Sequence, residues 1–319
     1  MNIKFIIIIL GEPYSTFSEI VGKYFTDKKI NKKKIIIIGN KSLFEKQLIK
    51  LKYKLNIKEI KNLNEAKKNT LNIINVDFKY KKIFGNITSK SRKFIENCFN
   101  LSLSLIRNQK SKYILINGPI SKKSFLSKRF LGITEYLSSK TKSKNEVMLI
   151  YNKDLSVTPL TTHIPIKLVS KNVSKKKIIN NIQLICAFYK KYLKKKIKIA
   201  VLGLNPHCET VDKVSEEESI IKPAIKNLKH KGIDISGPFS ADTFFLKDNI
   251  KKYDLVMGMY HDQVLTPIKT LFKFNAINIT IGLPFIRISP DHGPNFRMLG
   301  MNKSNPSSFY YAMKFIEKL

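Results

Sequence analysis

The stretch that decides the fold class is FIIIILGEP at residues 5–13, in which the first apolar run of the chain, six residues long, is followed by Gly11. Its β-branched residues favour a short strand buried on both faces, and the glycine favours a turn where the strand ends. The run is far shorter than the roughly 20 apolar residues that cross a bilayer, and no signal-peptide pattern surrounds it. We therefore expect a buried strand in a cytoplasmic protein without a membrane segment.

The same pattern recurs along the chain and alternates with amphipathic stretches, which is typical of an α/β fold. Further strands of similar composition are predicted at 34–38, 113–116, 147–151, 197–202, 255–259 and 276–281. Helices with apolar residues at three- and four-residue steps are predicted at 43–53, 91–106, 174–193, 215–228 and 307–319. The helix that begins at Ser215 has three glutamates in its first turn, where the helix dipole favours negative charge.

The charge of the chain is strongly positive. Against 59 Lys and Arg there are 23 Asp and Glu, a formal net charge of +36. Such a balance can indicate nucleic-acid binding, but the lysines are scattered and no aromatic residues alternate with them as a base-stacking surface requires. We interpret the lysines as solvated surface residues, which disfavours nucleic acid as a partner. The positive electrostatic field of the chain would still attract phosphorylated substrates and dinucleotides. Three widely spaced cysteines indicate reduced thiols: Cys98, Cys186 and Cys208.

Histidines are scarce, and four of the five lie in polar turns after apolar runs, at positions 163, 207, 261 and 292. Neither G-x-G-x-x-G nor a P-loop motif occurs, so a standard Rossmann or P-loop site is excluded. About one strand–helix–strand unit separates His163 from His207 and His207 from His261, so strand ends could bring them together. Three imidazoles with an open fourth position would form a catalytic site for a divalent metal. The alternative is that each histidine is an ordinary loop residue.

Other charged and polar residues lie near the same predicted strand ends. Asp242 follows a Gly-Pro turn and could hold or deprotonate a catalytic group, or it could cap the next turn. Lys269, Asn278 and Arg287 lie in the least charged, most strand-like part of the chain, where together they would suit a phosphate or carboxylate. The alternative for the two cations is an ion pair with a nearby acid, Asp262 or Asp291.

Four longer motifs are GLNPH at 203–207, GPFSADT at 237–243, MYHDQ at 259–263 and NITIGLPFIR at 278–287. Together they resemble the 4-hydroxythreonine-4-phosphate dehydrogenase family of pyridoxal phosphate biosynthesis. Weaker matches at 11–13, 118–122 and 161–163 extend the resemblance over nearly the whole chain. It implies a two-lobed α/β/α fold like that of isocitrate and isopropylmalate dehydrogenases, with the active site in the inter-lobe cleft. The first lobe would comprise residues 1–125 and 288–319, and the second, residues 126–287, would carry the metal and substrate residues.

The resemblance also implies an activity, namely metal-dependent oxidation of 4-phosphooxy-threonine at C3 with NAD or NADP, followed by decarboxylation. A homodimer would form the active site at its interface, with one divalent cation per subunit (Zn, Mg or Co) bound by His163, His207 and His261. Asp242 and Lys269 would be catalytic, and the substrate would contact Thr134, Lys269, Asn278 and Arg287. The cofactor would contact a loop that includes Asp291, His292 and Gly293.

One departure from the family pattern is Ile133, which stands in GITE at 132–135 where the family usually has G-H-T-E. Another is Tyr14, which begins a bulky stretch where the family has small residues. Two further interpretations follow. The chain could be a dehydrogenase for another phosphorylated or carboxylated hydroxy acid. It could instead be a weakly active relative that binds nucleic acid through its basic surface, in which case the binding affinity would fall steeply with salt. The change Ile133→His should raise kcat/KM if the family reaction is retained, or bury an unsatisfied polar group if the cleft has been reshaped.

Overall fold

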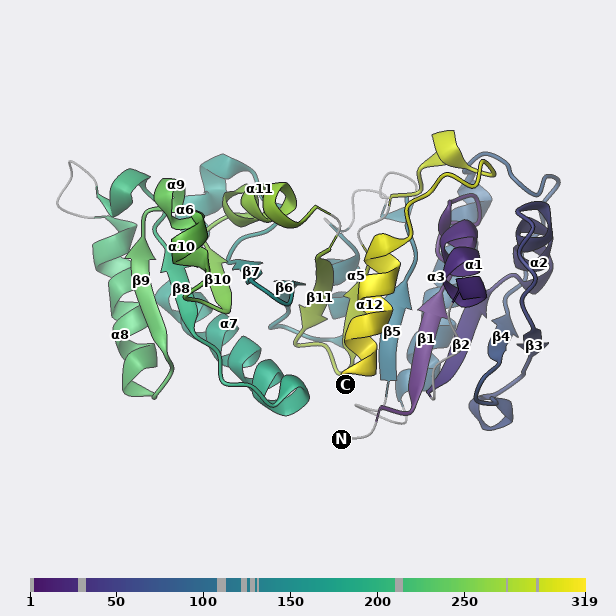
Figure 1. Cartoon of the computed structure of the whole chain (residues 1–319), viewed down its shortest axis with the longest axis horizontal. Coiled ribbons are helices and arrows are strands. Elements are labelled where there is room, and N and C mark those ends of the chain that lie inside the picture. Colours follow the sequence, from purple (N-terminus) through teal and green to yellow (C-terminus); the bar gives the residue numbers. More distant parts are fainter. Residues whose placement is uncertain are drawn as a thin grey trace. The chain divides into compact units, whose positions relative to one another are not determined.

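The computed structural model divides the chain into two compact units, Met1–Lys142 with Leu283–Leu319, and Ser143–Gly282 (Figure 1). The residues that it describes are 3–27, 33–107, 113–121, 125–126, 130, 132–209, 215–273, 275–290 and 293–319.

The first unit is built on a fully parallel sheet whose strands run in the order β3-β4-β2-β1-β5-β12. Its strands are β1 (Phe5–Ile9), β2 (Lys34–Gly39), β3 (Ile57–Glu59), β4 (Leu71–Asn75), β5 (Tyr113–Asn117) and β12 (Ile286–Ser289). The opening run of isoleucines forms β1, whose five residues are all buried. Because both faces of a parallel sheet are covered, alternation of polar and apolar residues is absent from these strands.

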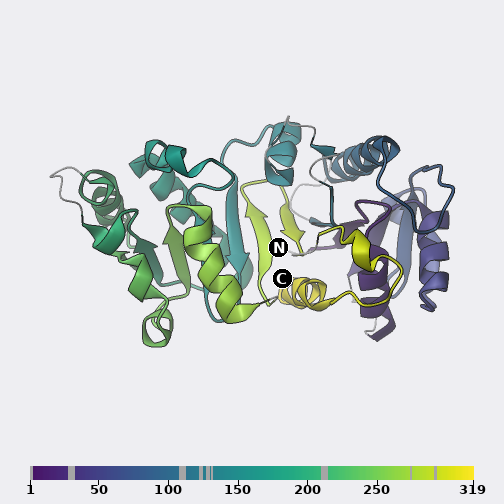
Figure 2. The ribbon, with the colours of Figure 1, turned by 90° about the horizontal axis from the view of Figure 1, so that it is seen from above.

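Helices cover both faces of this sheet (Figure 2). The helices of the unit are α1 (Phe17–Asp27), α2 (Lys41–Lys50), α3 (Ser89–Arg107), α5 (Ile133–Thr141) and α12 (Ser307–Glu317), with short 3₁₀ turns at Leu63–Glu65 and Phe296–Met298. On one face, α3 packs Phe94, Ile95 and Phe99 into a core with the alternate residues of β1 and β2. On the other face, the Phe17 ring of α1 meets the Phe309 ring of α12 edge-on at 5.5 Å between centroids.

The unit boundaries differ from the predicted lobes at 125/126 and 287/288. Residues 126–142 and 283–287 belong to the first unit. The physical reason is burial in its core, where Leu126, Ile133 and Phe285 join the apolar cluster under α3. Strand β12 also pairs with β5 from Ile286 onward, which ties this segment to the same sheet.

The second unit has a mixed sheet in the order β11-β6-β7-β10-β8-β9. Its strands are β6 (Val147–Tyr151), β7 (Ser156–Pro159), β8 (Ile199–Leu202), β9 (Ile235–Phe239), β10 (Leu255–Gly258) and β11 (Ile277–Ile281). Strand β6 is antiparallel to both β11 and β7, and the remaining pairs are parallel. The carboxyl ends of β7, β10 and β8 therefore meet at one edge of the sheet.

Helices again cover this sheet, and they account for the remaining elements of the unit. These are α6 (Val169–Asn172), α7 (Lys175–Phe188), α8 (Lys222–His230), α9 (Ala241–Phe244), α10 (Lys247–Ile250) and α11 (His261–Phe272), with shorter turns at Ile166–Leu168, Tyr189–Leu193, Pro206–Cys208 and Glu217–Ile221. Helix α11 packs Val264, Leu265 and Ile268 against alternate residues of β7, β8 and β10. The prediction of a strand-like segment around Lys269 is therefore wrong, because residues 261–272 form a helix with one buried apolar face.

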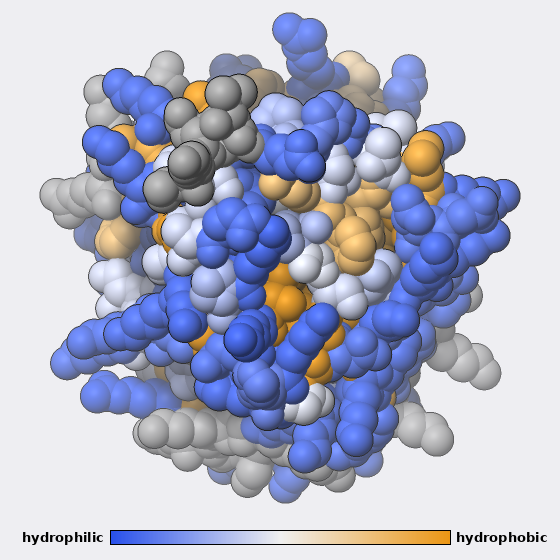
Figure 3. All heavy atoms as spheres, turned by 90° about the vertical axis from the view of Figure 1, so that its left-hand side faces the viewer, coloured by the Kyte–Doolittle hydropathy of each residue, from blue (hydrophilic) through white to orange (hydrophobic). Residues whose placement is uncertain are grey.

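All seven predicted strands and all five predicted helices are present, and the three cysteines are free. Figure 3 shows the face of the second unit that carries α8, which hydrophilic side chains largely cover. Within the described part of the chain, no helix is long and apolar enough to cross a membrane.

Candidate active site

Two of the three predicted metal ligands lie together in the second unit. Thr161 and His163 follow β7, and His261 begins α11 directly after β10, the parallel neighbour of β7. The pairing continues past the strands, since the Leu160 N–H donates to the Gly258 carbonyl at 2.8 Å. The centroids of the His163 and His261 rings are 5.7 Å apart. The strand register thus brings these two imidazoles to one place.

The geometry of this pair fits a shared divalent cation. Two imidazoles bound to one ion at about 2 Å have ring centres roughly 5 Å apart, slightly less than the separation found here. Nδ1 of His261 lies 2.6 Å from Oδ1 of Asp262. A carboxylate partner of this kind holds the proton on Nδ1 and leaves Nε2 as the metal-binding nitrogen.

The third predicted ligand, His207, lies elsewhere on the same unit. It sits in the short turn Pro206–Cys208 with φ of 56°, in the left-handed region, and its side chain is 76% exposed. Its Nδ1 is 3.8 Å from Oδ2 of Asp242. Among the residues that the structure describes, no group of three His, Cys, Asp or Glu side chains of one chain could hold a metal ion.

Asp242, the predicted catalytic carboxylate, is exposed at the start of α9 and neighbours His207. The Ser240 hydroxyl donates to its Oδ1, and the Thr243 N–H donates to the same oxygen at 2.9 Å. The pKa of Asp242 is lowered, chiefly by the Ser240 hydroxyl and further by Thr243 and His207. Asp242 is therefore an ionised acceptor at neutral pH, suited to orient an imidazole.

Arg287 and Thr134, two predicted substrate residues, meet in the first unit. Arg287 of β12 is 4% exposed; its Nε donates to Oδ1 of Asn117 at 2.8 Å, and its Nη1 donates to Oγ1 of Thr134 at 3.1 Å. Burial lowers the pKa of Arg287 to about 10, an effect that the nearby Glu135 charge opposes, so the guanidinium stays protonated at neutral pH. The sequence analysis missed Asn117, whose only signal was its place at the end of β5.

The other predicted substrate residues, Lys269 and Asn278, belong to the second unit. Lys269 lies exposed in the last turn of α11. Asn278 lies in β11, where its Oδ1 is buried without a hydrogen-bond partner among the described residues. A buried acceptor of this kind is rare, and a ligand can satisfy it.

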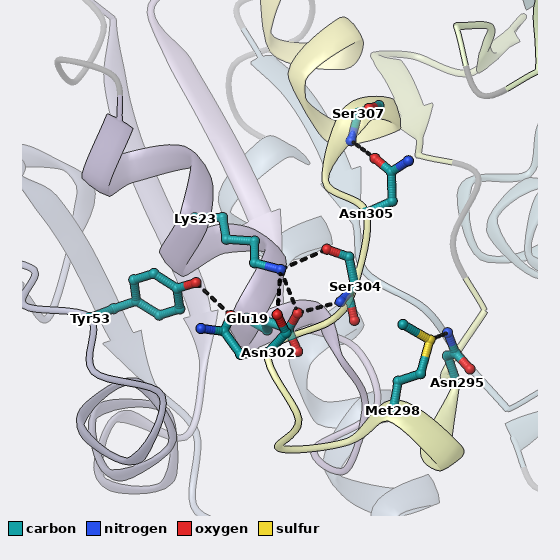
Figure 4. Close-up of polar contacts among 9 residues, drawn as sticks. All are labelled: Glu19, Lys23, Tyr53, Asn295, Met298, Asn302, Ser304, Asn305 and Ser307. Carbon is teal, nitrogen blue, oxygen red and sulfur yellow. Dashed lines mark hydrogen bonds and ion pairs between the residues drawn. The ribbon is translucent and has the colours of Figure 1, made fainter.

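The predicted cofactor loop is described only in part, because Asp291 and His292 lie outside the described residues. Gly293 is exposed, with no atom within 4 Å of the position that a Cβ would take. Further along the chain, Ser304 is anchored to α1 by an ion pair of the half-buried Lys23 and the buried Glu19 (Figure 4). Lys23 Nζ bonds Glu19 Oε1 at 2.8 Å and the Ser304 carbonyl at 2.8 Å, and Glu19 Oε1 accepts the Ser304 N–H at 2.5 Å.

Ile133, the departure from the family motif, belongs to the apolar core of the first unit. It is 9% exposed and clusters with Phe125, Tyr136 and Leu137. Tyr14 is also buried, and its ring meets Phe78 edge-on at 6.0 Å between centroids. Both departures therefore occupy the interior of the unit.

Comparison with known proteins places these features in a family context. A family model described as pyridoxal phosphate biosynthetic protein PdxA matches residues 31–316. The chain is 39% identical over 317 residues to a 4-hydroxythreonine-4-phosphate dehydrogenase of Sulfurihydrogenibium sp. strain YO3AOP1, covering 96% of this chain and 95% of the relative. It is 28% identical over 327 residues to a D-threonate 4-phosphate dehydrogenase of Salmonella typhimurium strain LT2, covering 100% of both.

Solved structures show the same likeness. A 4-hydroxythreonine-4-phosphate dehydrogenase from Klebsiella pneumoniae matches with a TM-score of 0.82 and 26% identity, covering 98% of this chain and 99% of that one. A β-decarboxylating dehydrogenase from Thermococcus kodakarensis, 9% identical with a TM-score of 0.51 and coverage of 98% and 83%, shows likeness of fold alone. These matches confirm the predicted fold class.

Proposed function

The chain belongs to the family of the pyridoxal phosphate biosynthetic protein PdxA, and we propose that it oxidises 4-phosphooxy-threonine at the C3 hydroxyl with NAD or NADP, followed by loss of CO2. Its classification as an oxidoreductase acting on a CH–OH group follows from that membership and confirms the prediction from the motifs. The observation that carries the proposed mechanism is the pair of imidazoles, His163 and His261, at adjacent strand ends.

In the proposed site, His163 and His261 of one subunit and His207 of a second subunit bind one divalent cation. Such a cation stabilises negative charge on the substrate oxygen during hydride loss and during decarboxylation. The exposure of His207 supports this arrangement, since it leaves the imidazole available to a second copy. Asp242 lies 3.8 Å from Nδ1 of that imidazole, on the side where Asp262 contacts His261, so its charge favours a proton on Nδ1 and leaves Nε2 for the cation.

Substrate binding in this proposal uses two cationic side chains and an amide. The guanidinium of Arg287, held by Asn117 and Thr134, supplies a fixed positive charge for a phosphate or carboxylate. Lys269 supplies a second cation and acts in catalysis, and the amide oxygen of Asn278 accepts a hydrogen bond from the substrate. Asp291, His292 and Gly293 would contact the nicotinamide cofactor.

The shared metal site can be tested by mixing two inactive variants. Both His207→Ala and His261→Ala should lose bound metal and NADH production on 4-phosphooxy-threonine, whereas His230→Ala, an exposed histidine on α8, should lose neither. If the ligands come from two subunits, each mixed dimer regains one intact site, so an equilibrated mixture should recover about a quarter of the wild-type activity. If mixing restores nothing, the ligands are not shared. Full metal content in His261→Ala would refute the metal site itself.

A second candidate function is the oxidation of a phosphorylated hydroxy acid such as D-threonate 4-phosphate, the substrate named for one relative. The observation that favours it is the burial of Ile133 in the apolar core, since no imidazole at that position can contact the substrate. Measuring kcat/KM for both substrates with the same enzyme preparation decides between them: the higher value identifies the substrate class.

A further inference from the structure

A chain of buried hydrogen bonds links the loops that carry the three histidines. The Thr161 hydroxyl donates to the Met259 carbonyl at 2.6 Å. The Met259 N–H donates to Oε1 of Gln263 at 2.7 Å, and Nε2 of the same amide donates to the Gly203 carbonyl at 2.7 Å. Gln263 is 8% exposed, and its side chain thus joins the end of β10 to the end of β8.

At the far end of this chain, a buried carboxylate holds the loop before His207. Oε1 of Glu217 accepts the N–H groups of Leu204 at 2.7 Å and Asn205 at 2.9 Å, and Oε2 accepts the Asn205 amide at 2.8 Å. Glu217 is fully buried, at 0% exposed. Burial alone would raise its pKa, but these hydrogen bonds outweigh burial and lower it, so the carboxylate stays ionised at neutral pH.

Two glycines leave room for these side chains. A Cβ at Gly258 would lie 2.6 Å from Cγ1 of Val264 and 2.9 Å from Oε1 of Gln263. A Cβ at Gly203 would lie 2.7 Å from Sγ of Cys208 and 3.0 Å from Oε1 of Glu217. A larger residue at either strand end would therefore crowd the hydrogen-bonded group together with the side chain packed beside it.

The residues that make these hydrogen bonds stand at the same spacing before each of the three histidines. Thr161, Met259 and Asn205 each lie two residues before His163, His261 or His207, respectively. A shift of any of these backbone groups would move the next imidazole with it. Each end of the Gln263 amide is used once, as donor and as acceptor, so neither a carboxylate nor an apolar side chain of the same size can replace both bonds.

We propose that Gln263 is a positioning residue that fixes the His261 loop relative to the His207 loop, with Thr161 and Glu217 extending the same restraint to His163 and to the start of the His207 turn. This role rests on the proposed metal site. Gln263 touches neither metal nor substrate; it acts by setting the places from which the imidazoles reach the cation in each subunit.

The test measures binding of Co²⁺ to the metal-free full chain by titration, with visible absorption as the report on coordination. Gln263→Leu and Gln263→Glu should each weaken Co²⁺ binding by about 10- to 100-fold and alter the absorption bands of the bound ion. The matched control is Asn72→Leu, which removes another buried amide that bonds backbone carbonyls, those of Ile35, Lys67 and Thr70, far along the chain from any histidine loop. It should lower stability and leave Co²⁺ binding and absorption unchanged.

The outcomes separate this inference from the proposed function. Wild-type chain that binds no Co²⁺, or binds it equally in His261→Ala, would overturn the metal site and this role together. Wild-type binding that depends on His261 but is unchanged in either folded Gln263 variant would overturn only the role of Gln263. An equal loss of affinity in Asn72→Leu would show that general destabilisation is responsible, and this too would refute a positioning role.

Discussion

The substitution Ile133→His restores the imidazole that the family motif carries, and the structure predicts that it is harmful. Ile133 is the first residue of α5, is 9% exposed, and packs with Phe125, Tyr136 and Leu137. Loss of its burial costs about 1.5–3 kcal/mol if the new side chain leaves the core. If the imidazole stays, its nitrogens need partners that the apolar cluster lacks, at about 1–3 kcal/mol. Either way, we expect the free energy of unfolding to fall by roughly 2 kcal/mol.

Urea denaturation followed by circular dichroism measures this cost, with Ile133→Val as the matched control, expected to lose about 0.5–1.5 kcal/mol. The deficit of the histidine variant should grow as the pH falls below about 6.5, because burial disfavours the charged imidazole. We expect no gain in kcat/KM on 4-phosphooxy-threonine. A histidine variant as stable as the valine variant, with kcat/KM raised tenfold or more, would refute this reasoning and favour retention of the family reaction.

Two further substitutions test the buried charges of the first unit. Arg287→Lys should lower the free energy of unfolding by about 1–3 kcal/mol, because one ammonium cannot replace both the bond to Asn117 and the bond to Thr134. Unchanged stability in urea denaturation would contradict this prediction. The KM of the same variant reports the part of Arg287 in substrate binding. Glu12→Gln should raise the free energy of unfolding at pH 7 by about 1–3 kcal/mol and have little effect near pH 3. Burial raises the pKa of Glu12 above 4.5, and hydrogen bonding to Ser91 and to a backbone N–H offsets this rise only in part. The folded chain therefore binds the proton more tightly than the unfolded chain, so stability falls as the pH rises through the folded-state pKa. An equal effect of Glu12→Gln at both pH values would exclude this titration.

Continuous β-branched runs predicted seven of the strands, but β7, inside the second sheet, was missed. Their length and β-branched composition favoured buried strands for the isoleucine runs of β1 and β2, and both strands are where they were predicted. Strand β9 was missed, because its sequence ISGPF contains a Gly-Pro pair that normally indicates a turn. Helix α11 was missed for a similar reason, since Pro267 lies inside it and its first residues are polar.

For the candidate site, strand order was the decisive information that the sequence lacked. His163 and His261 could be placed at strand ends from their motifs, but their meeting depends on β7 and β10 being neighbours. The contact of His207 with Asp242 depends likewise on the turn after β8 facing the start of α9. Composition cannot report either adjacency, because both arise from the folding of distant segments.

Two buried glutamates show that not every charged side chain of this basic chain lies on a solvated surface. With 23 Asp and Glu against 59 Lys and Arg, an acid in this chain could be expected to balance surface lysines. Glu19 and Glu217 instead are at most 1% exposed, and each accepts backbone N–H groups of a loop, Glu19 from Ser304 and Glu217 from Leu204 and Asn205. Glu217 was interpreted from sequence as a favourable charge in the first turn of a helix. Its carboxylate also turns to the loop before His207, where the N–H groups that it accepts offset the cost of its burial.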